Sequence, residues 1–129
     1  MGLRNLVKRY PEMKFVACHL LAPSDKDKDK LRQALEVLQF PNLWFDLSSL
    51  VHNCRPDTYP YLKAIEFIRL AKEIVGSEKL MFGTDMPSAL KEDVYEHYVG
   101  YIDESPVFTE QEKEQIFYEN AYEVYFANK

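Results

Sequence analysis

The sequence has few cysteines and glycines and no excess of basic residues. Its 129 residues include two cysteines, four glycines and 16 Lys or Arg against 21 Asp or Glu, which gives a net charge of -5. Cys18 and Cys54 form no C-x-x-C motif and no disulfide framework, so we interpret them as buried or idle thiols. An acidic chain without a clustered Lys/Arg face is a poor candidate for binding nucleic acid.

Long apolar runs are absent as well. The longest, LWFDLSSLV, is far shorter than the ~20 residues that a bilayer span requires, and no basic segment followed by an apolar one opens the chain. We therefore expect a cytoplasmic protein without a membrane partner. The composition, 47% hydrophobic and 29% charged, is typical of a globular protein, and we expect residues 1–129 to form a single domain.

Three short apolar runs alternate with helical patterns along the chain. The runs KFVACHLL (14–21), LWFDLSSL (43–50) and KLMFGTD (79–85) are each typical of a strand buried on both faces. The helical spacing of apolar residues predicts four helices, over 3–10, 31–38, 64–75 and 90–102. A fifth helix is predicted to start at Thr109, whose spacing to Glu112 predicts a capping box. Residues 24–30 alternate in charge and are predicted to form a solvated loop, and 51–60 is a candidate functional loop.

This alternation predicts right-handed βαβ units and hence a parallel sheet. Three strands leave two open edges, and a complete (βα)8 barrel needs ~250 residues, about twice the number present. The sequence therefore predicts an α/β fold that is part of a larger structure.

Two polar residues end predicted strands at the place where parallel α/β folds carry their catalytic groups. In the first run His19 follows the apolar residues 15–18, and Asp85 ends the third run. Gly83, two residues before Asp85, leaves room for a ligand or a neighbouring strand. Each has a structural alternative, because His19 could be a satisfied core histidine and Asp85 a helix or turn cap.

The second run contributes Asp46 and Ser48 on one face of its strand. Asp46 could be held by backbone amides, whereas Ser48 is a candidate for contact with a substrate. His52, four residues later on the loop, is a candidate ligand or acid/base group. His97 lies in an acidic, tyrosine-rich segment and is predicted to be a surface histidine.

Four segments together resemble a known family. RYPEMKFVACH, NLWFDLSS, AKEIVGSEKLMFGTDMP and TEQEKEQIFYENAYEVYF are similar to the last portion of the amidohydrolase-related metal-dependent hydrolases, the group that includes aminocarboxymuconate-semialdehyde decarboxylase-like enzymes. The segment 76–87 is the most specific of these, and E-N-A at Asn120 supports it.

The resemblance implies a partial (βα)8 TIM barrel, about the last three βα units, and thus the C-terminal half of a metal-dependent hydrolase. It implies that His19 and Asp85 are catalytic residues and ligands of a divalent metal, zinc first and manganese second, with Asp85 as the acid/base group. Ser48 and His52 would contact a small carboxylate, amide or lactone that is hydrolysed or decarboxylated.

The sequence also departs from the family. It contains no H-x-H, the motif that supplies two metal ligands in the family, and Leu20, Leu21 and Ala22 stand where glycines often follow the histidine. Two hypotheses remain open. The chain is an enzyme fragment that needs an N-terminal half, or it is a non-catalytic half-barrel that forms a homo-oligomer through its open edges.

Overall fold

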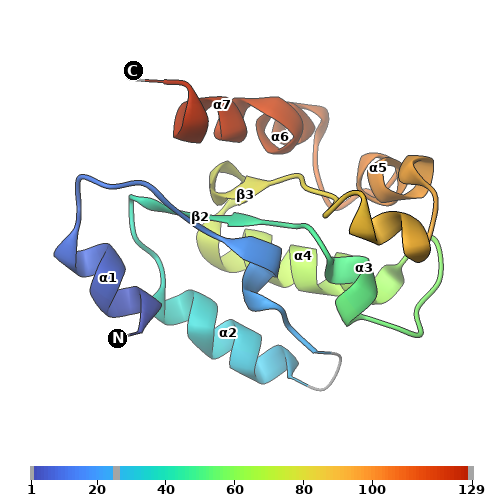
Figure 1. The fold of residues 1–129 in the computed structure, drawn as a ribbon, viewed down its shortest axis with the longest axis horizontal. Helices are drawn as coiled ribbons and strands as arrows, with labels where there is room; N and C mark the ends of the chain where they lie inside the picture. The colour runs from blue at the N-terminus through green and yellow to red at the C-terminus, as the bar shows by residue number, and fades with distance from the viewer. Residues whose placement is uncertain (1, 25–26, 128–129) are drawn as a thin grey trace.

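A computed structural model describes residues 2–24 and 27–127, and the predicted loop residues Asp25 and Lys26 lie outside that range. Figure 1 shows a small sheet with helices above and below it. The elements in chain order are α1 (Leu3–Arg9), β1 (Phe15–Ala17), η1 (Cys18–Leu21), α2 (Lys28–Val37), β2 (Leu43–Asp46), α3 (Leu50–Asn53), α4 (Leu62–Val75), η2 (Ser77–Lys79), β3 (Leu80–Met81), η3 (Ser88–Lys91), α5 (Tyr95–Asp103), α6 (Glu110–Glu114), η4 (Gln115–Glu119) and α7 (Asn120–Tyr125).

The sheet is parallel, as predicted, with the strands in the order β1-β2-β3. Val16 lies opposite Trp44 and Phe45 lies opposite Leu80. The strands are shorter than the predicted runs, since β1 ends at Ala17 and β3 at Met81. The remaining residues of each run form the turns that follow the strands.

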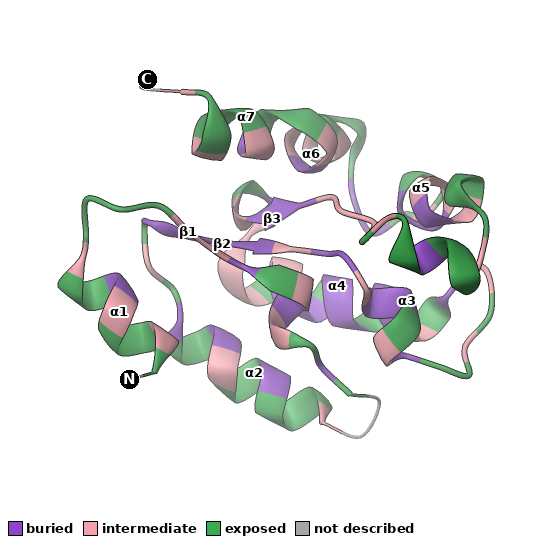
Figure 2. Ribbon diagram, viewed as in Figure 1, coloured by how far each residue is buried: buried purple, intermediate pink, exposed green. Residues whose placement is uncertain are grey.

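A core layer lies between the sheet and the helices α2 and α4, which are below the strands in Figure 1. The predicted helix over 64–75 is confirmed as part of α4, and its buried face includes Phe67 and Ile68. In Figure 2 the buried residues of α2 and α4 form stripes on otherwise exposed or half-buried helices. Leu35, Phe45 and Leu80 are almost completely buried in this layer.

Three predicted segments differ from the observed ones. The last residues of the expected loop 24–30 belong to α2, which begins at Lys28. The expected loop 51–60 begins inside a helical turn, α3. The expected helix over 90–102 is two pieces, η3 and α5, because Val94 is extended and its amide donates to Asp93 Oδ1 at 2.8 Å. This local bond competes with helical pairing, as Asp side chains commonly do.

The predicted capping box at Thr109 is confirmed by two reciprocal bonds. Glu112 N donates to Thr109 Oγ1 at 3.2 Å, and Thr109 N donates to Glu112 Oε2 at 2.9 Å. The box starts a helix that runs through α6, the π-helical segment η4 and α7 without a break.

The π-helical segment attaches this C-terminal helix to the third strand. Phe82 N donates to Ile116 O at 2.9 Å, and the buried Asn120 side chain donates to Ser77 O and Leu80 O. A π segment is an insertion of one residue in an α-helix, which leaves backbone carbonyls available to other partners. None of the helices in the described ranges is both long and apolar enough to cross a bilayer.

Candidate active site at the carboxyl ends of the strands

Each of the three strands is followed by a non-glycine residue in the left-handed region. His19 has φ 58° after β1, Ser49 has φ 59° after β2, and Asp85 has φ 62° after β3. This conformation is uncommon for residues other than glycine, and such strain clusters at functional sites. The sequence-predicted residues His19 and Asp85 thus lie in the turns beyond the strands, at one end of the sheet.

Asp46 at the end of β2 is the centre of one cluster. Its Oδ1 accepts hydrogen bonds from His19 N at 2.9 Å, Ser48 N at 3.1 Å and Ser48 Oγ at 2.5 Å. Two of these donors are backbone amides, as the sequence analysis allowed. The carboxylate therefore holds together the turns that follow β1 and β2.

The bonds around Asp46 also determine its charge. Burial raises the pKa of Asp46, but the hydrogen bonds from Ser48, His19 and the Cys18 thiol outweigh it, so the pKa lies below its usual value. The same bond to Asp46 is the main reason that the pKa of Cys18 is raised. Cys18 is exposed and forms no disulfide, so at neutral pH it is a neutral thiol beside an ionised carboxylate.

The bonding of Ser48 assigns the tautomer of His19. His19 Nδ1 lies 2.7 Å from Ser48 Oγ, and that hydroxyl already donates its hydrogen to Asp46. A serine hydroxyl has one hydrogen, so His19 Nδ1 must be the donor in the neutral ring. His19 Nε2 then carries a free lone pair, and 38% of the side chain is exposed. His19 is therefore not the fully buried core histidine of the alternative interpretation.

Asp85 has far fewer bonds than Asp46. Its Oδ2 accepts one hydrogen bond, from Ser49 Oγ at 2.6 Å, and within residues 2–24 and 27–127 Oδ1 has no hydrogen-bond partner. The turn after Asp85 is closed by its backbone carbonyl, which accepts from Ala89 N at 3.1 Å. The side chain is thus not a cap, and one carboxylate oxygen is open to a ligand.

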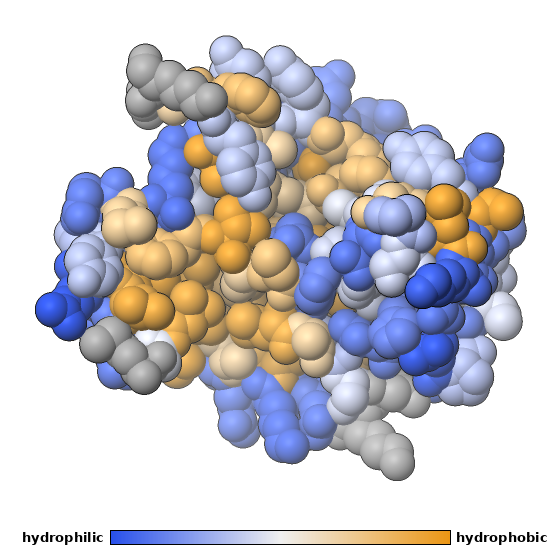
Figure 3. Space-filling view, viewed as in Figure 1, coloured by the Kyte–Doolittle hydropathy of each residue, from blue (hydrophilic) through white to orange (hydrophobic). Residues whose placement is uncertain are grey.

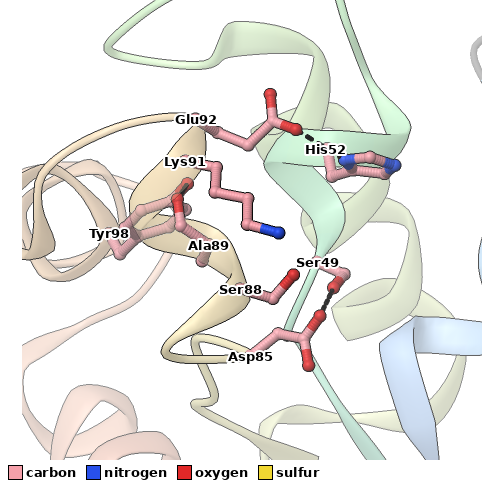
Figure 4. Close-up of a pocket in the computed structure, with 8 residues that line it drawn as sticks. All are labelled: Ser49, His52, Asp85, Ser88, Ala89, Lys91, Glu92 and Tyr98. Atoms are coloured by element: carbon pink, nitrogen blue, oxygen red, sulfur yellow. Dashed lines mark hydrogen bonds and ion pairs between the residues drawn. The ribbon is translucent and has the colours of Figure 1, made fainter.

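A pocket of about 300 Å³ lies beside Asp85 (Figure 4). It is formed by the turn after β2, the helix α3, the segment after β3 and α5. The lining residues are Ser49, His52, Asp85, Ser88, Ala89, Lys91, Glu92 and Tyr98. The volume is at the small end of the range for small-molecule sites.

His52, a predicted substrate contact, lines this pocket with both ring nitrogens engaged. Nδ1 lies 2.9 Å from Glu92 Oε1, and Nε2 lies 3.0 Å from Arg55 Nη2. Arginine can only donate, so Nε2 accepts and Nδ1 donates to Glu92. Arg55 Nη1 also donates to Glu92, at 3.1 Å. These bonds tie the loop after β2 to the segment after β3.

A second set of contacts lies farther out along the same two segments. His97 is paired with Asp93 at 2.8 Å and stacks on Tyr59 with ring centroids 4.2 Å apart. Tyr61 also donates to Asp93. The predicted surface histidine is therefore partly exposed but has fixed partners, and these contacts join the loop after α3 to the segment around the start of α5.

The structure brings the predicted residues together in two groups. His19 and Ser48 belong to the Asp46 cluster, whereas Asp85 and His52 line the pocket. Ser49, Lys91 and Glu92 also line the pocket and were missed by the sequence analysis. Ser49 could have been found from its place beside Ser48, but no sequence signal pointed to Lys91 or Glu92.

A divalent metal requires more ligands than the described residues of this chain offer. Within the described ranges, no group of three or more His, Cys, Asp or Glu side chains is placed to hold a metal ion. Catalytic zinc has three protein ligands and an open position, so His19 and Asp85 alone do not complete such a site.

Comparison with known proteins supplies the family. The amidohydrolase family model matches residues 2–127, while no curated protein matches the sequence. Several solved structures have the same fold, and three of them are each matched over 95% of this chain. An amidohydrolase from Burkholderia multivorans with bound zinc has 24% identity and a TM-score of 0.82 and is matched over 95% of this chain and 47% of its own.

The other two are less similar. Amidohydrolase 2 from Bifidobacterium longum subsp. infantis has 17% identity and a TM-score of 0.72, over 95% of this chain and 44% of its own. The 5-carboxyvanillate decarboxylase from Sphingomonas paucimobilis has 19% identity and a TM-score of 0.60, over 95% of this chain and 36% of its own. The chain thus spans less than half the length of these structures, and its fold is part of a TIM barrel. It belongs to the amidohydrolase family.

Proposed function

We propose that this chain is the C-terminal half of an amidohydrolase barrel and supplies one side of an active site that a second polypeptide segment completes. The enzyme would hydrolyse or decarboxylate a small carboxylate, amide or lactone. The observation that carries the proposal is the placement of an open imidazole nitrogen, His19 Nε2, and an open carboxylate oxygen, Asp85 Oδ1, in the turns that follow β1 and β3. Active sites of (βα)8 barrels form at this end of the strands.

The two residues would have different roles. His19 and Asp85 would be this chain's two ligands to a divalent metal, zinc or manganese, and the missing segment would have to bring the rest. Asp85 would also act as the general acid/base, because its Oδ1 is free to take up a proton and release it. Ser48 would orient His19, and His52 would form a wall of the substrate pocket.

A second candidate function, a non-catalytic half-barrel that self-associates, is favoured by exposed apolar surface. The C-terminal helix carries four exposed aromatic residues at helical spacing, Tyr118, Tyr122, Tyr125 and Phe126. Figure 3 shows a broad hydrophobic area between the positions of α1 and α7. On the sheet, the buried Trp44 Nε1 has no hydrogen-bond partner in the described part of the chain. Large exposed apolar patches mark interaction sites.

Metal content and solution mass distinguish the two candidates. For the isolated chain we expect sub-stoichiometric zinc or manganese after dialysis, and self-association by light scattering at micromolar concentration. The chain joined to an N-terminal segment that contains an H-x-H should bind about one metal per complete barrel and lose the self-association, and His19→Gln should lower that occupancy. About one tightly held metal per monomer of the isolated chain would show that the site needs no second segment.

A further inference from the structure

The side chain of Lys91 has a position in the pocket that none of the roles above uses. Figure 4 shows its ammonium group directed into the space between Ser88 and Ser49. Across residues 2–24 and 27–127, no carboxylate lies within 4.0 Å of this ammonium group, and it donates no hydrogen bond. The Ser88 hydroxyl points into the same space and is also without a partner in those residues.

The second cation near the pocket is not available in this way. Arg55 donates to His52 Nε2, His52 O and Glu92 Oε1, so its guanidinium is committed to holding the wall together. Glu92 in turn is neutralised by Arg55 and bound to His52. Lys91 is therefore the cation in the described part of the pocket whose charge is open to a ligand.

We propose that Lys91, with the Ser88 hydroxyl, binds a carboxylate group of the ligand and so makes the pocket selective for carboxylate-bearing molecules. The assignment of that ligand as substrate rests on the proposed function, whereas the anion site itself does not. A lysine ammonium is a compact point charge with three rotatable donors, which suits a single carboxylate. The ligand would lie with its carboxylate at Lys91 and its remaining atoms toward Asp85 Oδ1.

The charges around the site favour a carboxylate over a phosphate. Asp85 lines the same pocket as Lys91, and in the described ranges no cation is paired with it, so a doubly charged phosphate would face an uncompensated carboxylate with one open cation. A singly charged carboxylate balances Lys91, and Asp85 repels it about half as strongly as it repels a doubly charged phosphate. The η3 helix has only four residues, so we assign its N-terminus no part in binding.

Binding of benzoate to the isolated chain, followed by amide NMR shifts without added metal, tests the proposal. Benzamide is the neutral ligand of the same shape, and inorganic phosphate is the competing anion. We expect benzoate to shift the amides of residues 85–92 more strongly than benzamide or phosphate does. Lys91→Met should weaken benzoate binding about tenfold, as loss of one charge-assisted hydrogen bond predicts, and Lys91→Arg should retain most of it.

Lys8→Met is the matched control, since Lys8 is an exposed lysine on α1, far from the pocket in Figure 1, and its loss changes the net charge equally. The proposal is wrong if Lys8→Met and Lys91→Met weaken benzoate binding alike, if benzamide or phosphate binds as well as benzoate, or if benzoate does not bind. Because no metal or turnover enters the measurement, failure of the proposed enzymatic function would leave these outcomes unchanged.

Discussion

Two carboxylates at the ends of neighbouring strands have opposite environments. Asp46, the last residue of β2, accepts three hydrogen bonds on a single oxygen and joins two turns, whereas Asp85, beyond the end of β3, accepts one and presents its other oxygen to a pocket. A carboxylate surrounded by donors is committed to structure, and one with an open oxygen is available for chemistry. Both residues are aspartates near the carboxyl end of a strand, so the number of donors around each carboxylate distinguishes their roles.

The adjacent serines repeat this contrast. Ser48 is buried and bonds to both Asp46 and His19, while Ser49 bonds to Asp85 alone. The dipeptide thus contacts the turn after β1 on one side and the turn after β3 on the other. Substitutions of the two aspartates and the two serines therefore test whether their environments differ in this way.

The largest expected effect is on turnover, from Asp85→Asn in the barrel completed by its N-terminal half. We expect kcat to fall by about 100-fold to 10,000-fold, the usual cost of losing a general acid/base group. The melting temperature of the isolated chain should barely change, because asparagine keeps the volume and part of the bonding. Asp29→Asn on α2 is the control for charge. A large loss of stability with turnover intact would make Asp85 a structural residue.

The next effect is on folding, from Asp46→Ala. This change leaves the amides of His19 and Ser48 without their acceptor, and we expect it to lower the free energy of unfolding by about 2 to 3 kcal/mol. Asp85→Ala, which removes one exposed acceptor, should cost less than about 0.5 kcal/mol. Urea denaturation followed by circular dichroism measures both. Equal losses would mean that the two carboxylates do not differ as their bonding indicates.

Replacing the serines should give a smaller difference in the same direction. Ser48→Ala removes two hydrogen bonds of a buried hydroxyl and should cost about 1 to 1.5 kcal/mol of unfolding free energy. Ser49→Ala removes one exposed bond and should cost about 0.5 kcal/mol or less. The same urea titrations compare these neighbours directly, and a larger loss at Ser49 would contradict the assignment of Ser48 to the structural cluster.

The smallest effect is on the pH dependence of stability. The pKa of Asp46 is lowered in the folded protein from an ordinary value of 3.8, so its stabilising contribution is present above that value and is lost as the pH falls through the folded pKa. We expect Asp46→Asn to be less sensitive than the parent chain to acid below about pH 4. Urea midpoints measured between about pH 6 and pH 2.5 test this, with Asp29→Asn as control. Parallel curves for the parent chain, Asp46→Asn and Asp29→Asn would show that Asp46 does not contribute to the acid dependence of stability.

Much of the fold could be predicted because periodicity and capping are local. The stripe of α4 and the capping box at Thr109 depend on residues within a few positions of one another. The ends of the strands could not be predicted, because non-glycine residues such as His19 and Asp85 adopt left-handed conformations that their side chains disfavour. Hydrogen bonds to the neighbouring strand ends compensate for that cost, and such bonds have no local signature.

The sequence indicated residues of the candidate site, but not which of them bond to one another. The position of Asp85 at the end of an apolar run indicated a functional carboxylate, and the interpretation that backbone amides could hold Asp46 agrees with its bonds from His19 N and Ser48 N. No sequence pattern indicated Lys91. The direction of its side chain depends on the short turn η3, which is held by backbone hydrogen bonds such as the one from Ala89 N to Asp85 O.

The π-helical segment η4 has a consequence for how this chain tolerates insertions and deletions. The wider π turn already contains one extra residue, so deleting one residue between 115 and 119 would restore ordinary helical pairing and leave α7 near its present orientation. Deleting one residue in α6 instead would rotate everything beyond it by about 100° around the helix axis. The amide of Asn120 would then turn away from the carbonyls of Ser77 and Leu80, and the aromatic stripe of α7 would face in a new direction. The helix can therefore lose one residue inside η4, where only the π turn disappears, but not in α6, where the loss would reorient the side chains of α7.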